Sequence, residues 1–125
     1  MKGKPSQITV MALDPDPLVH MGLEALLSQR PKIQLVGTAN TYQDALGQLE
    51  KSSPDVLLTE VTLPDRSGAE ACRDVIEAYP GTRVLFLALY QEQAAVYSSL
   101  LAGASGFLLK ESARERLPNS DRNDG

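Results

Sequence analysis

Charged side chains occur at the ends of several short apolar runs of this sequence. Four such residues lie at or near these ends: Asp14, Asp16, Glu60 and Lys110. If the runs are parallel strands of one sheet, their carboxyl ends meet at one edge and bring these groups together. Carboxylates so placed could bind a divalent cation, and a lysine beside them could be either a structural partner or a poised reactive group. We expect the structural ion pair, because two acids stabilise the charged lysine without any catalysis.

The only histidine and the only cysteine of the chain do not indicate a second site. His20 lies opposite the apolar face of an amphipathic stretch, on the same side as Glu24 and Ser28, so we expect it in solvent. It has no second histidine and no nearby cysteine with which to hold a metal. Cys72 lies on an apolar helical stripe with Val75, and we expect it in the core.

Composition excludes several classes of function. The 125 residues suffice for one compact domain but not for a second one. With 12 Lys and Arg against 16 Asp and Glu, the net charge is −4, which disfavours direct nucleic-acid binding by this chain. The apolar stretch Ile8–Leu13 is too short for a membrane span or a secretion signal, so we expect a cytoplasmic protein.

Apolar runs alternate with stretches of helical period along the chain, which is typical of βαβ units and a parallel sheet. The expected strands are Ile8–Leu13, Ile33–Thr38, Val56–Val61, Val84–Leu89 and Gly106–Leu109. Helices are expected from Pro17 to about Arg30, from the cap Thr41 to about Ser52, from the end of the loop Thr62–Gly68 through Tyr79, and over Gln91–Ala102. Asp16 before Pro17 predicts a helix N-cap more than a metal ligand. The predicted fold is α/β, a flavodoxin-like doubly wound parallel sheet of about five strands, whose last helix is short or missing.

Three segments carry a resemblance to a known family. They are Asp14-Pro-Asp-Pro-Leu-Val19, Asp55-Val-Leu-Leu-Thr-Glu-Val-Thr-Leu-Pro64 followed by Gly68, and Gly103-Ala-Ser-Gly-Phe-Leu-Leu-Lys110. Over residues 8–110 the chain resembles the receiver domains of bacterial response regulators, especially those of LuxR-type transcription factors. The resemblance divides the chain into a receiver-like domain over residues 1–110 and a tail or incomplete last helix over residues 111–125.

The resemblance implies a self-phosphorylating site that this sequence has altered at three positions. Glu60 stands where the family has its phosphoacceptor aspartate, and its extra methylene displaces the carboxylate by roughly 1 to 1.5 Å. Pro15, after Asp14, replaces the acid that contacts Mg²⁺, and Ala88 replaces the phosphoryl-binding hydroxyl. Any Mg²⁺ would be held only weakly, by Asp14 and Glu60.

Two family positions remain in place. Lys110 aligns with the family's lysine, and Phe107 stands at its switch aromatic, where packing is the simpler role. We therefore expect a pseudo-receiver that is not an enzyme, needs no cofactor and signals through protein partners independently of phosphorylation. One alternative is a working phosphoacceptor that uses Thr59, Glu60 or Asp65, and another is a fragment of a DNA-binding response regulator. A flavin-binding enzyme is disfavoured, because two acids and two prolines follow the first strand.

The last part of the chain predicts where partners bind. Only residues 112–117 could continue a helix before Pro118, so the cover of the fourth and fifth strands should be short. Alternate apolar residues within Val84–Leu87 and Phe107–Leu109 would then stay in water. We expect a protein partner or self-association through this fourth-helix and fifth-strand face, with a mobile tail.

Overall fold

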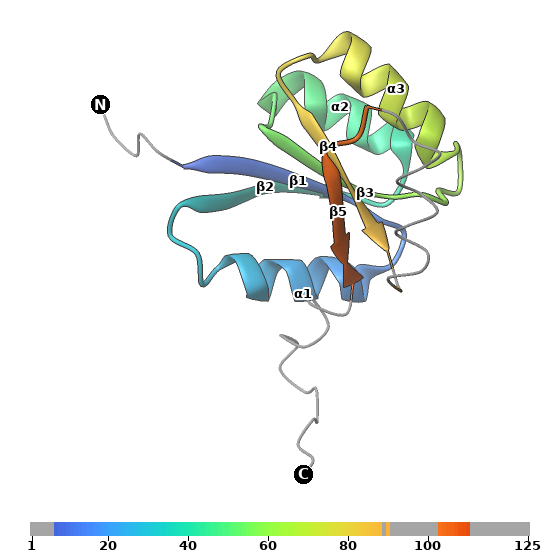
Figure 1. The fold of residues 1–125 in the computed structure, drawn as a ribbon. Coiled ribbons are helices and arrows are strands. Elements are labelled where there is room, and N and C mark those ends of the chain that lie inside the picture. Colours follow the sequence, from blue (N-terminus) through green and yellow to red (C-terminus); the bar gives the residue numbers. More distant parts are fainter. Residues whose placement is uncertain (1–6, 89, 91–102, 111–125) are drawn as a thin grey trace.

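The computed structural model describes residues 7–88, 90 and 103–110, and these form one parallel sheet with helices on both faces (Figure 1). The strands are β1 (Ile8–Leu13), β2 (Ile33–Ala39), β3 (Val56–Glu60), β4 (Arg83–Ala88) and β5 (Gly106–Leu109). The helices are α1 (Pro17–Leu27), α2 (Tyr42–Ser52) and α3 (Gly68–Ala78). The sheet order is β2-β1-β3-β4-β5, with all pairs parallel. The predicted flavodoxin-like doubly wound fold is confirmed.

Both faces of the central strands β1, β3 and β4 are largely buried, which explains why these strands are almost continuously apolar. Val10 and Ala12 of β1 pack with α1, whereas Met11 and Leu13 pack in the larger cluster with α2 and α3. This alternation follows from the two-residue period of a strand. Figure 1 shows the same layering, with α1 below the sheet and α2 and α3 above it. Cys72 is 1 % exposed within the larger cluster, so its predicted core position is confirmed.

The helix starts agree with the capping residues of the sequence. The Asp16 carboxylate accepts a hydrogen bond from the Leu18 N–H at 3.0 Å, and Pro17 is the first helical residue. The helix ends at Leu27, earlier than the predicted Arg30, and the chain continues in turns in which the Gln29 and Arg30 N–H groups donate to the carbonyl oxygens of Leu26 and Leu27. The fourth expected helix lies outside the described residues, as does the expected tail.

The prediction that alternate residues of the fourth strand stay in water is wrong. Val84, Phe86 and Leu87 are buried, and Leu85 is partly buried. On β5, Phe107 is 41 % exposed. The side chains of β4 are covered on both faces, because Val84 and Phe86 pack in the larger core cluster and Leu85 and Leu87 in the cluster that contains α1. In the part of the chain that the structure describes, no helix has the length and apolarity needed to cross a bilayer.

Candidate functional site

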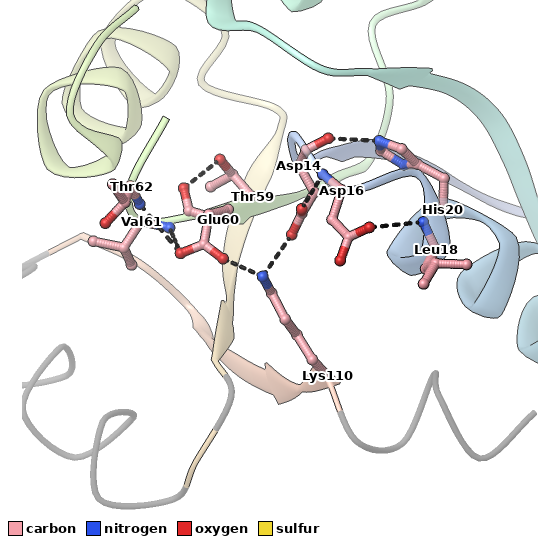
Figure 2. Close-up of polar contacts among 9 residues, drawn as sticks. All are labelled: Asp14, Asp16, Leu18, His20, Thr59, Glu60, Val61, Thr62 and Lys110. Atoms are coloured by element: carbon pink, nitrogen blue, oxygen red, sulfur yellow. Dashed lines mark hydrogen bonds and ion pairs between the residues drawn. The ribbon is translucent and has the colours of Figure 1, made fainter. Parts of the chain in front are cut away.

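The site lies at the carboxyl ends of β1, β3 and β5, where three charged side chains converge (Figure 2). Lys110 Nζ lies 2.9 Å from Asp14 Oδ2 and also contacts Glu60 Oε1. Strand order explains the meeting, because β1 and β3 are neighbours and β5 is separated from β3 only by β4. The predicted ion pair of Lys110 is therefore confirmed with both acids at once.

Asp14 is the most deeply buried member of this ion triad, with no exposed surface. Its Oδ1 accepts a hydrogen bond from the Asp16 N–H at 2.8 Å. Its Oδ2 is buried and makes no well-oriented hydrogen bond, so the ammonium of Lys110 supplies its compensation as a charge. An uncompensated carboxylate at this depth would be expensive.

The ammonium of Lys110 is strongly held in its charged form. Burial by itself lowers the pKa of Lys110, but the hydrogen bond that its ammonium donates to Glu60, its close contact with Asp14 and the negative charges of both acids outweigh the effect of burial. The net result is a pKa raised above the ordinary value of 10.5. Lys110 is thus a fixed cation at neutral pH, which does not fit a role as a base or a nucleophile.

Glu60 has both of its carboxylate oxygens engaged. Oε1 contacts Lys110, while Oε2 accepts hydrogen bonds from the Val61 N–H at 2.9 Å and the Thr62 N–H at 3.2 Å. The additional methylene of glutamate lets the side chain fold back over the start of the following loop (Figure 2). Glu60 is therefore bound through both carboxylate oxygens by groups of this chain.

The donor set does not fit Mg²⁺, the metal that the fold family implies. Pro15 offers no side-chain oxygen, and Asp16 is turned to the start of α1 as its cap. Asp14 and Glu60 remain, but Lys110 already lies between them. Among the described residues no group of three His, Cys, Asp or Glu side chains could hold a metal. A magnesium octahedron needs more oxygen ligands than this arrangement offers.

The other expected site residues are not placed to react. Ala88 is buried at 1 % exposure and carries no hydroxyl. Thr59 is fully buried, and its hydroxyl donates to the Glu60 carbonyl oxygen at 3.0 Å, away from the carboxylate. Asp65 lies at the start of α2, where its two oxygens accept the N–H groups of Tyr42 and Gln43, each at 3.0 Å.

The expectation that His20 is solvated is wrong. The side chain is partly buried, and its Nε2 donates to the backbone carbonyl oxygen of Asp14 at 2.8 Å, while Nδ1 is buried without a hydrogen-bond partner. His20 thereby fixes the backbone of the residue whose carboxylate pairs with Lys110. Helical periodicity assigned His20 to the polar side of α1 but could not show that the β1–α1 loop returns over that side.

Sequence reasoning also missed the contacts that hold the β3–α3 loop. The sequence suggests Asp65 only as an alternative phosphoacceptor and gives no indication of a role for Arg66. Arg66 forms an ion pair with Asp74 at 2.5 Å, and its guanidinium carbon lies 5.4 Å from the centre of the Tyr42 ring. No local pattern indicates these contacts, because Asp65 and Tyr42 are 23 residues apart.

The Asp65 contact predicts a specific acid sensitivity. Hydrogen bonds from the Tyr42 and Gln43 N–H groups lower the pKa of Asp65 below its ordinary value of 3.8. A lowered pKa stabilises the fold above pH 3.8, and this contribution is lost as the pH falls through the folded-state pKa. Thermal melting from pH 7 to pH 2 should therefore show parent and Asp65→Asn converging in stability at the acid end. A gap between them that stays constant with pH would contradict the assignment, and Glu50→Gln in α2 is the control.

Comparisons with known proteins agree with the fold. The sequence profile of the family described as "Response regulator receiver domain" matches residues 10–120. The doubly wound sheet, with charged residues at its carboxyl edge, defines an α/β domain of the flavodoxin-like class. The chain belongs to the receiver domain family of response regulators.

Several relatives of the chain are transcriptional regulators. The chain is 33 % identical over 112 residues to the transcriptional regulatory protein DegU of Brevibacillus brevis, covering 90 % of this chain and 48 % of that protein. It is 36 % identical over 104 residues to the DNA-binding transcriptional activator DevR/DosR of Mycobacterium tuberculosis, covering 83 % and 48 %. The receiver domain of NarL from Mycobacterium tuberculosis superposes with a TM-score of 0.75 at 35 % identity, with 90 % of each chain covered. The chain spans about half the length of the curated relatives it matches.

Proposed function

We propose that this chain is a phosphorylation-independent receiver domain that takes part in signal transduction or transcription regulation by binding other proteins. It acts as an interaction module and not as an enzyme. Its site already holds an anion, the Glu60 carboxylate, against the ammonium of Lys110 and two backbone N–H groups. A carboxylate carries about −1 where a phosphoryl group carries about −1.5 to −2.

The observation that carries this proposal is the double engagement of Glu60. The groups that would stabilise a phosphoryl group at this position are positive charge and backbone N–H donors. Lys110 and the N–H groups of Val61 and Thr62 are such donors, and all three are bound to the Glu60 carboxylate. Phosphoryl transfer to Glu60 would have to break these contacts, and no metal ion would compensate for their loss.

A second argument comes from positioning. Phosphoryl transfer depends on an in-line nucleophile, and misplacement by about 1 Å can cost about a hundredfold in rate. The glutamate side chain has one methylene more than the family's aspartate, and here it is folded back onto its own loop. The length and the orientation of the Glu60 side chain therefore both disfavour its attack on a phosphoryl group.

The relatives support a connection with transcription. The names of DegU and DevR/DosR describe a transcriptional regulatory protein and a DNA-binding transcriptional activator. Because this chain corresponds to about half of each, a role as the receiver part of a DNA-binding regulator is the second candidate, and it is compatible with the first. The partner surface that we propose from the sequence is the expected fourth-helix and fifth-strand face, for a protein partner or a second copy. Of this face the structure describes β5, on which Phe107 is 41 % exposed.

Restoring the family's residues tests the explanation for the lost chemistry. The combined variant Pro15→Asp, Glu60→Asp and Ala88→Thr should gain Mg²⁺ binding, because it returns a missing ligand, shortens the carboxylate and supplies a hydroxyl. Each single change should gain little, since groups that act as a unit are not additive. Titration with Mn²⁺ by calorimetry, with displacement by Mg²⁺, measures the gain.

The parent chain is the control in the same titration, and melting curves confirm that each variant is folded. If the folded triple variant binds no divalent cation, the three substitutions do not explain the altered site. Metal binding by the parent comparable to that of the triple variant would contradict the proposal directly.

A further inference from the structure

The loop between β3 and α3, residues 61–67, supplies both N–H groups that bind Glu60. The loop is closed at its base, because Thr62 pairs with Ser67 in an antiparallel bridge and the Gly68 N–H donates to the Val61 carbonyl at 2.6 Å. The remote part of the loop, Asp65 and Arg66, does not touch Glu60. It contacts α2 and α3 instead.

Two side chains fasten that remote part. Asp65 accepts the first two N–H groups of α2, from Tyr42 and Gln43, at 3.0 Å each. Arg66 pairs with Asp74 of α3 at 2.5 Å and stacks over the Tyr42 ring. Tyr42 is only 7 % exposed and belongs to the core cluster, so the loop is tied to a rigid part of the molecule.

We infer that Asp65 and Arg66 are positioning residues of the Glu60 site, which hold the β3–α3 loop on α2 and α3 so that the Val61 and Thr62 N–H groups stay on the carboxylate. The inference rests on the proposal that Glu60 is the resident anion of the site. Two consecutive N–H groups can point at one oxygen only in a narrow range of loop backbone angles. Contacts at the far end of so short a loop restrict those angles without touching the site.

A purely structural alternative is that Asp65 serves only as a cap of α2. The chain offers a matched control for this, because Thr41 also caps α2, through its hydroxyl and the Asp44 N–H at 3.1 Å. Thr41 precedes α2 and is not part of the β3–α3 loop. Loss of either cap weakens the helix start, but only loss of Asp65 should release the loop.

The experiment compares Asp65→Ala, Arg66→Met and Thr41→Ala with the parent. Amide NMR shifts of Val61 and Thr62 report their hydrogen bonds to Glu60, and mass spectrometry measures the acylation rate of the Lys110 amine relative to Lys32.

We expect Asp65→Ala and Arg66→Met to move both amide signals and to raise Lys110 acylation several-fold. Thr41→Ala should lower the melting temperature while leaving both readouts at parent values. Asp65→Asn, which keeps an acceptor oxygen, should restore them in part.

Two results would overturn the inference. One is that Asp65→Ala and Arg66→Met leave the amide signals of Val61 and Thr62 and the Lys110 reactivity unchanged. The other is that Thr41→Ala changes them as much as Asp65→Ala does. Asp65 is exposed and Arg66 and Thr41 are partly exposed, so these variants should fold, and melting curves verify it. Failure of phosphorylation independence would be seen separately, as a gain of a phosphoryl group by the parent.

Discussion

Replacing Lys110 with methionine is expected to destabilise the domain by about 3–5 kcal/mol, the range for removing one partner of a buried ion pair. Methionine keeps the length and apolar bulk of the side chain but carries no charge. Asp14 has no exposed surface, so its Oδ2 would then be buried without compensation. Glu60 is affected less, because its Oε2 retains two backbone N–H groups. Chemical denaturation at pH 7 measures the loss.

Two further variants separate charge from packing. Adding Asp14→Asn to Lys110→Met should recover part of the lost stability, because no buried charge is then left unpaired. Lys32→Met, at an exposed position, should stay within about 0.5 kcal/mol of the parent. If Lys110→Met lowers the free energy of unfolding no more than Lys32→Met does, the ion triad does not hold the strand ends together.

Replacing Gly68 with alanine is expected to cost about 1–3 kcal/mol, the range for overpacking a well-filled position. A Cβ at Gly68 would lie 2.6 Å from both Cα and the carbonyl oxygen of Val61, and 2.8 Å from the carbonyl oxygen of Glu60. All of these are backbone atoms, so the chain has to shift where the loop leaves β3. The variant should therefore melt at a lower temperature and also displace the N–H groups that bind Glu60.

Gly47 is the matched control, since it lies within α2 and a Cβ there would meet nothing within 4 Å. Gly47→Ala should stabilise the protein by about 0.5–1 kcal/mol through helix propensity. A Gly68→Ala variant that gains stability as Gly47→Ala does would show that the loop has room, and that the close approach to β3 is not a constraint.

Much of the fold could be predicted because local sequence patterns indicate it. The bounds of β1 and β5 agree with prediction to the residue, and those of the other strands to within one residue over the described part of the chain. Capping residues located the starts of α1 and α2, through Asp16 and Thr41. These signals are short-range, so one sequence suffices to read them.

The ion triad could be predicted for a topological reason. Carboxyl ends of parallel strands share an edge, and Asp14, Glu60 and Lys110 are attached directly to such ends. His20 and Asp65 could not be predicted, because their contacts depend on how two loops fold back over helix termini. The loop conformations are set by the tertiary structure, which helical period and capping patterns do not contain.

Phosphorylation independence is tested most directly by weighing the protein after treatment with a phosphodonor. The parent chain is incubated with acetyl phosphate and Mg²⁺ and measured by intact-mass spectrometry, beside a receiver domain that has the family's aspartate as a positive control. We predict that the parent mass is unchanged while the control gains a phosphoryl group. A stoichiometric gain of one phosphoryl group by the parent, removed by hydroxylamine, would show an acyl phosphate and contradict the account.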